Sequence, residues 1–220
     1  MAQSEQIESP DPAQAAWGGR GSRTGDPRDQ HSSALPGGPD FHRMIKALTL
    51  VQDRIATAAA SDDVVSRAAL VLENLAADLA PYAVPERQRI TGHRLDLPGR
   101  GQALVPAFHI DEWDDKHATG RFTLGRYYLG GNGAAHGGVI PLVFDEVLGR
   151  LANTGRPIAR TAYLHVNYSS ITPIGPELRL EARIDREEGR KRFLTASMYE
   201  GDRLTADAEG LFVALRPGQP

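Results

Sequence analysis

The 220-residue sequence contains no cysteine, which excludes disulfide bonds, thiol nucleophiles and thiolate metal sites. It also lacks an excess of charge, since the net charge of -3 offers no basic surface for nucleic acid or anionic membrane. No stretch approaches the roughly 18 uninterrupted apolar residues of a membrane span. The N-terminus holds Glu5, Glu8 and Asp11 and has no apolar signal-peptide core. We therefore expect a cytoplasmic protein that binds neither nucleic acid nor membrane.

The chain divides into three parts by composition. Residues 1–40 are rich in Gly, Pro, Ser, Asp and Gln and cannot bury enough apolar surface to offset their ordering entropy, so we expect a disordered tail. Residues 41–85 predict a helical hairpin that packs on the main domain or on a partner subunit. Its apolar stripes are Met44, Leu48, Val51 and Ile55, then Val64, Ala68, Leu72, Leu75 and Leu79. Ser61 is the expected N-cap of the second helix, and Pro81 and Pro85 end it.

Residues 86–220 form the expected main domain, in which one helix interrupts a series of strands. The strand candidates are 103–112, 117–124, 159–171, 176–185, 191–200 and 203–215, and the helix runs to about Asn153. Gly189 and Gly201 mark tight turns, which favour an antiparallel meander. One long helix against so many strands predicts an α+β fold with the sheet curled around the helix.

The segment from His136 to Leu151 is the most informative in the chain. Six residues follow helical spacing and form one broad apolar stripe: Ile140, Val143, Phe144, Val147, Leu148 and Leu151. If the helix begins near Gly138, Pro141 falls in its first turn, where the missing N–H does no harm. Gly137 and Gly138 then leave backbone N–H groups open at the positive end of the helix dipole. Such groups can bind a developing oxyanion or a polarised carbonyl.

Asp145 lies about 140° around this helix from Ile140, and no basic residue stands three or four positions away from it. Glu146, by contrast, has Arg150 at i+4, which predicts a surface ion pair. Gly149 lies one turn from Asp145 and could leave space for a substrate. Two alternatives to a functional role stay open, because Asp145 could pair with an arginine from a strand or face water.

The run from Asn132 to Glu146, NGAAHGGVIPLVFDE, resembles the core motif of hotdog-fold acyl-CoA thioesterases of the PaaI/THEM type. In that family a His-Gly-Gly segment opens the central helix and an acid follows nine positions after the histidine, as Asp145 follows His136. Residues 165–175, HVNYSSITPIG, are similar to the family's strand that ends in a Pro-x-Gly turn. Residues 206–213 resemble its last strand. The resemblance covers roughly residues 100–215.

The resemblance implies a hotdog fold and hydrolysis of an acyl-CoA thioester without a cofactor. The Gly137 N–H would polarise the thioester carbonyl, while Asp145 would act as general base or as nucleophile. His136 would support the entrance, and Gly138 would help to bind substrate. It further implies a homodimer, or a dimer of dimers, with the helix entrance and the acid of each site on different subunits.

The chain departs from the family pattern at two helper positions. Many relatives carry a side-chain amide six residues before the histidine, where this chain has Gly130, and Asn132 is the nearest substitute. Where some relatives place a water-orienting serine, the match is Tyr163, with Thr161 predicted on the same strand face. Either hydroxyl could serve, or both could be ordinary strand packing.

Three other functions stay open. A non-catalytic acyl-CoA-binding hotdog protein would need Asp145 buried in an ion pair or a closed pocket. A hotdog enoyl-thioester hydratase or dehydratase would need a different histidine–acid motif, and a partner-binding protein would use residues 41–82. Arg190, Lys191 and Arg192 could meet coenzyme A phosphates, although a solvated hairpin tip is favoured. The remaining histidines show no metal-site spacing.

Overall fold

The computed structural model describes residues 35–219, and the predicted disordered tail lies almost wholly outside this range. Two helices come first, α1 (Asp40–Thr57) and α2 (Asp62–Leu79), and three short 3₁₀ helices follow: η3 (Ala80–Tyr82), η4 (Glu86–Gln88) and η5 (Pro98–Gly101). The remaining elements are β1 (His109–Trp113), β2 (His117–Thr123), η6 (Arg126–Tyr128), β3 (Leu129–Gly131), β4 (Ala134–Ala135), α3 (Val139–Asn153), β5 (Ala159–Tyr168), β6 (Glu177–Glu188), β7 (Lys191–Glu200) and β8 (Arg203–Ala214).

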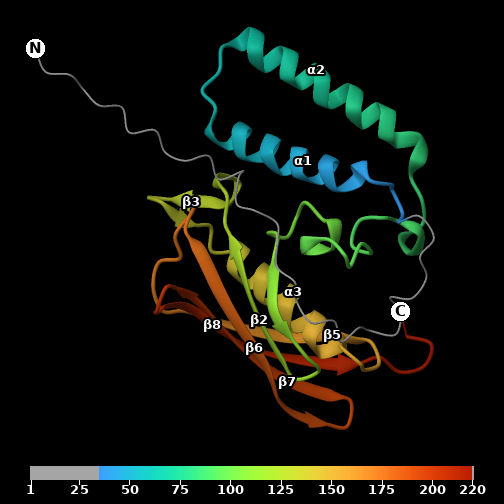
Figure 1. Cartoon of the computed structure of the whole chain (residues 1–220), viewed down its shortest axis with the longest axis vertical. Coiled ribbons are helices and arrows are strands. Elements are labelled where there is room, and N and C mark those ends of the chain that lie inside the picture. Colours follow the sequence, from blue (N-terminus) through green and yellow to red (C-terminus); the bar gives the residue numbers. More distant parts are fainter. Residues whose placement is uncertain (1–34, 220) are drawn as a thin grey trace, which may run out of the picture.

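Six strands form one antiparallel sheet in the order β1-β2-β6-β7-β8-β5, and this sheet curls around α3 (Figure 1). The predicted stripe of α3 is buried in full, because Ile140, Val143, Phe144, Val147, Leu148 and Leu151 are each at most 2% exposed. Leu178, Leu180, Leu194, Met198 and Phe212 cover it from the sheet. The predicted α+β architecture, with one central helix in a curved sheet, is confirmed.

One strand boundary was predicted wrongly. The first strand begins at His109 rather than at residue 103, because residues 103–105 form bends and the pairing with β2 starts only at His109. The glycine-rich stretch before α3 forms the small hairpin β3–β4. Its turn is Asn132–Gly133, where both residues have a positive φ, as in the turns that suit two-residue hairpin loops.

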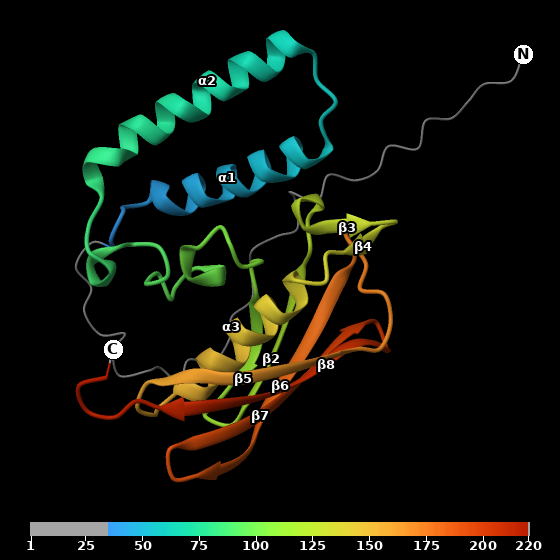
Figure 2. The same ribbon diagram turned by 180° about the vertical axis from the view of Figure 1, so that it is seen from behind.

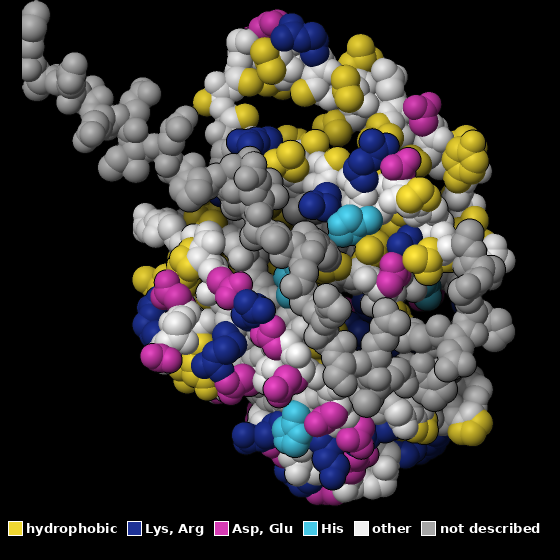
Figure 3. Space-filling model, viewed as in Figure 1, with side chains coloured by type: hydrophobic (Ala, Val, Ile, Leu, Met, Phe, Trp, Pro, Cys, Tyr) yellow, Lys and Arg dark blue, Asp and Glu magenta, His cyan; other side chains and the backbone are white. Residues whose placement is uncertain are grey.

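The two predicted N-terminal helices are present, and α1 lies between α2 and the sheet domain (Figure 2). Phe41 at the start of α1 is buried, whereas α2 buries no side chain. Hydrophobic side chains therefore remain visible on the surface of both helices (Figure 3). No helix between residues 35 and 219 is long and apolar enough to cross a membrane.

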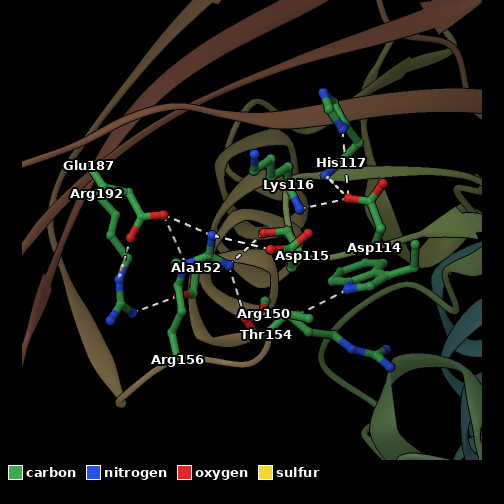
Figure 4. Close-up of polar contacts among 11 residues, drawn as sticks. Asp114, Asp115, Lys116, His117, Arg150, Ala152, Thr154, Arg156, Glu187 and Arg192 are labelled. Atoms are coloured by element: carbon green, nitrogen blue, oxygen red, sulfur yellow. Dashed lines mark hydrogen bonds and ion pairs between the residues drawn. The ribbon is translucent and has the colours of Figure 1, made fainter. Parts of the chain in front are cut away.

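A buried arginine holds the C-terminal end of α3 (Figure 4). Arg192 on β7 is 4% exposed and donates to the carbonyls of Ala152 (2.6 Å) and Pro157 (2.8 Å). Cations and donors stabilise this end of a helix because its last carbonyls lack partners within the helix. Burial lowers the pKa of the Arg192 guanidinium. The preferred interpretation of residues 190–192 as a solvated tip is therefore wrong for Arg192.

We predict that Arg192→Met lowers the free energy of unfolding by about 2–4 kcal/mol, because two carbonyls near the core lose their donor. Chemical denaturation measures the change. The matched control is Lys191→Met at the exposed neighbouring position, which should leave stability within about 0.5 kcal/mol. Equal stability of the two variants would show that Arg192 does not support α3.

Candidate functional site

The helix α3 begins where the sequence predicts, but the predicted open N–H of Gly138 is bonded to the His136 ring. Gly138 is the N-cap, and Pro141 is the third helical residue, so its missing N–H lies in the first turn. The segment before the helix is held on both sides: the Ala135 N–H donates to the Thr172 carbonyl (2.8 Å), and the His136 N–H donates to the Tyr128 carbonyl (2.7 Å). The His-Gly-Gly segment thus has a defined backbone path.

The four consecutive backbone N–H groups from His136 to Val139 differ in whether they have a hydrogen-bond acceptor. The N–H of His136 is bonded to Tyr128, that of Gly138 to the Nδ1 atom of His136 (3.0 Å), and that of Val139 to the His136 carbonyl (3.0 Å). For the Gly137 N–H, no acceptor exists among the residues that the structure describes. An exposed donor without a partner, at a helix N-terminus, is available to a ligand.

His136 and Tyr168 hold the peptide group that follows this donor. Its N–H belongs to Gly138 and is bound by the His136 ring, which requires an unprotonated Nδ1. Its carbonyl belongs to Gly137 and accepts a hydrogen bond from the Tyr168 hydroxyl (2.8 Å). His136 therefore supports the backbone, in line with the role that the resemblance implies. Tyr168 on β5 was missed, and its only signal was even spacing from Leu164 and Val166 on one strand face.

A small hollow opens beside Gly137. Its volume is about 290 Å³, and its lining is mostly apolar or small: Ala134, Ala135, Gly137, Ile140, Tyr168, Ser170, Ile171 and Thr172. An apolar surface next to a backbone donor suits a ligand with a carbonyl and a hydrocarbon part.

Asp145 is exposed on the side of α3 opposite its buried stripe. Its Oδ1 atom accepts a hydrogen bond from the Thr161 hydroxyl of β5 (2.7 Å). No ion pair involves Asp145 within residues 35–219, so the alternative of a strand arginine is not observed there. The structure thus brings Asp145 and Thr161 together, with a carboxylate that is oriented but not neutralised.

Glu146 does not pair with Arg150, contrary to the prediction. Its two carboxylate oxygens accept from Nε and Nη2 of Arg100, at 2.6 and 2.7 Å. Arg150 lies over the Trp113 ring instead, 4.8 Å from its centroid. The reason is tertiary: the turn at Gly99–Gly101 carries Arg100 against α3, and a bidentate pair is stronger than an exposed i,i+4 pair.

Thr161 and Tyr163 do not share a strand face, which corrects the second helper prediction. A bulge in β5 pairs Thr161 with Phe212 but Tyr163 with the next residue, Leu211. Because Phe212 is buried toward α3, Thr161 faces the helix and Tyr163 faces away from it. Tyr163 stacks on His165 on that outer face, with ring centroids 4.5 Å apart.

The other predicted residues lie as follows. Asn132 is in the β3–β4 turn, and its amide makes no hydrogen bond to any described residue. An added side chain at Gly149 would meet Phe212 at 3.4 Å, so this glycine packs near β8.

At Gly130, where the resemblance leads to the expectation of an amide side chain, a Cβ atom would lie 2.9 Å from the His136 Cα. This backbone has no room for that helper.

The described part of the chain contains no cluster of three or more side chains arranged to hold a metal ion. The groups that the structure brings to the site are the Gly137 backbone donor, the Asp145 carboxylate and the hydroxyl groups of Thr161 and Tyr168.

Known proteins with similar sequences include acyl-coenzyme A thioesterases and a putative esterase. Acyl-coenzyme A thioesterase THEM4 of Bos taurus is 33% identical over 106 residues, which are 47% of this chain and 44% of that protein. THEM5 of Mus musculus is 26% identical over 130 residues, 58% of this chain and 51% of that protein. A putative esterase of Pseudomonas aeruginosa is 29% identical over 112 residues, 50% of this chain and 73% of that protein. The chain thus spans about half the length of the THEM relatives.

One solved structure extends the similarity beyond the sheet domain. It is the crystal structure of a thioesterase superfamily protein with a TM-score of 0.69 and 27% identity, and it covers 82% of this chain and 93% of that chain. No protein-family model matches the sequence. The relatives and this fold confirm the resemblance that the motifs indicate.

We predict that Gly130→Ala lowers the free energy of unfolding by about 1–3 kcal/mol, because the added methyl group meets the backbone of His136. It should also shift the amide resonances of residues 136–138. Gly131→Ala is the matched control, since a Cβ atom there meets nothing within 4 Å. Indistinguishable spectra and stabilities for the two variants would contradict the close approach.

Proposed function

We propose that this chain, a relative of hotdog-fold thioesterases in sequence and fold, hydrolyses an acyl-CoA or related acyl thioester to a free acid and a thiol. One observation carries the proposal. The helix whose entrance presents the unpartnered Gly137 N–H also presents Asp145, a carboxylate without an ion pair among the described residues. The names of the THEM relatives support the same chemistry.

In this proposal the Gly137 N–H donates a hydrogen bond to the thioester oxygen. Negative charge develops on that oxygen when the carbonyl carbon is attacked, and a preorganised donor at the positive end of a helix dipole stabilises it. Gly138 and the apolar hollow beside Gly137 bind the substrate around the carbonyl. His136 and Tyr168 hold the donor's backbone in place.

Asp145 supplies the reactive carboxylate by one of two routes. As a general base it takes a proton from water, whose oxygen bonds to the carbonyl carbon. As a nucleophile it bonds to that carbon itself and forms a mixed anhydride, which water then hydrolyses. In either route the carbon–sulfur bond breaks, the thiolate takes up a proton, and the acid is released. Thr161 orients the carboxylate through its hydrogen bond.

The spacing along α3 favours a site that is shared between two copies of the chain. Gly138 and Asp145 are seven residues apart, which is about 10 Å along a helix at 1.5 Å per residue. An Asp145 carboxylate that attacks directly must approach within about 3.5 Å of the carbonyl carbon, and this spacing keeps it too far from a carbonyl held at the entrance of the same helix. We infer a homodimer, or a dimer of dimers, in which Gly137 of one subunit meets Asp145 of the other.

The edge strand β5 is the proposed contact between the copies. It is the last strand of the sheet, so one side of its backbone is free to pair, and it carries both Thr161 and Tyr168. Pairing β5 with its symmetry mate would bring the α3 helices of two copies side by side.

We predict that Asp145→Asn lowers kcat by about 10²–10⁴-fold while the protein stays folded, because the amide neither accepts a proton nor attacks carbon. Thiol release from acyl-CoAs of increasing chain length measures the rate. Asp202→Asn in the exposed β7–β8 turn is the control and should match the wild type. Equal rates for Asp145→Asn and wild type would remove Asp145 from the mechanism. Wild-type binding without turnover would support a non-catalytic acyl-CoA-binding protein instead.

A complementation experiment tests the shared site. Gly137→Pro deletes the donor N–H, and Asp145→Asn deletes the carboxylate, so each variant alone should be inactive. After the two are mixed under exchange, half of the dimers are mixed and each holds one intact site, which should restore about a quarter of wild-type activity. Circular dichroism checks that both variants fold. No recovery in a mixture shown to exchange would contradict a site shared between subunits.

A further inference from the structure

The Asp53 carboxylate links the C-terminal half of α1 to the sheet domain. Asp53 Oδ1 accepts a hydrogen bond from the Tyr127 backbone N–H of η6, at 2.8 Å. Both carboxylate oxygens lie over Gly125, where an added Cβ atom would be 2.5 Å from each of them. The absence of a side chain at Gly125 therefore lets Asp53 reach the backbone at the start of η6.

The helix η6, to which Asp53 bonds, supports the His136-Gly137-Gly138 segment. The Tyr128 carbonyl accepts the His136 N–H (2.7 Å), and the Tyr128 hydroxyl donates to the Leu104 carbonyl (2.9 Å). Burial, with smaller effects of Tyr127 and Asp53, raises the pKa of Tyr128 to about 12, so this hydroxyl remains a donor at neutral pH. The backbone of Gly130 packs against the Cα atom of His136 from the same side.

This arrangement has a direct consequence for the proposed oxyanion donor. The N–H of Gly137 belongs to the peptide group that begins at His136. Any movement of η6 would move the Tyr128 carbonyl, and with it the His136 N–H and the direction of the Gly137 N–H. A shift of a fraction of an ångström in such a donor weakens its bond to a developing oxyanion.

We propose that Asp53 is a positioning residue for the Gly137 donor, so that α1 is a working part of the active site rather than an appendage to the sheet. The proposal rests on the proposed thioesterase function. It also gives the helical hairpin a purpose that packing alone does not explain, since α1 buries only Phe41 and α2 buries no side chain.

The test compares Asp53→Ala, Asp53→Asn and the control Asp40→Ala in the full chain. Asp40 is an exposed aspartate at the start of α1 whose ion pair within residues 35–219 is with Arg43 on the same helix. Three quantities are measured for each variant: kcat and KM for an acyl-CoA, the amide hydrogen exchange of His136 without substrate, and that of Leu151 at the far end of α3. The last reports general loosening of the domain.

For Asp53→Ala we expect kcat to fall about tenfold with KM changed less than threefold, because the donor stabilises the transition state more than the bound substrate. The His136 amide should exchange about tenfold faster while that of Leu151 is unchanged, since only the local support is lost. Asp53→Asn keeps an acceptor oxygen and should lie between Asp53→Ala and wild type. Asp40→Ala should match the wild type.

Wild-type kcat in Asp53→Ala, an unchanged His136 exchange rate, or equal acceleration at His136 and Leu151 would each overturn the proposal. The exchange measurement needs no substrate, so it separates this proposal from the thioesterase function. If the wild type turned over no thioester but His136 responded selectively to Asp53→Ala, the proposed function would fail while the structural link would stand.

Discussion

Burial of one face of α3 inside the curled sheet is the constraint on which the rest of the structure depends. Six apolar side chains of this helix are removed from water, which fixes its rotation about its own axis. Because residues advance by 100° each, the buried stripe leaves Asp145 on the open side. Burial of the stripe thus leaves the Asp145 carboxylate exposed. Arg192 bonds to the C-terminal end of the same helix at Ala152.

At the N-terminal end of α3, the existing hydrogen bonds determine which backbone N–H can bind a ligand. Three of the four consecutive N–H groups from His136 to Val139 are bonded within the loop or to Tyr128, and that of Gly137 has no acceptor in the part of the chain that the structure describes. The backbone of Gly130 packs on His136, so that a Cβ atom at this position would lie 2.9 Å from the His136 Cα atom. The path of this loop therefore depends on the absence of a side chain at Gly130.

The segments that precede the sheet contact the candidate site at two places. Arg100, in a left-handed conformation that is unfavourable for a residue with a Cβ atom, forms a bidentate pair with Glu146 beside Asp145. Asp53 of α1 reaches η6 behind the His-Gly-Gly segment. The segments before the sheet carry no recognisable motif, yet one contacts α3 next to Asp145 and the other contacts the support of the Gly137 donor.

The sequence by itself determined the α+β class, the central helix and its buried stripe, and the position of Asp145 away from that stripe. The last two features follow from spacing along one element, where each residue's direction is set by its neighbours in the chain. Only the tertiary structure decided that Thr161 faces Asp145 while Tyr163 turns away, since that depends on a bulge relative to β8. It also decided the contacts of Arg192 with Ala152, Arg100 with Glu146 and Asp53 with Tyr127, which join residues 40, 46 and 74 positions apart. Local spacing carries no information about such pairs, because the folding of the whole domain brings them together.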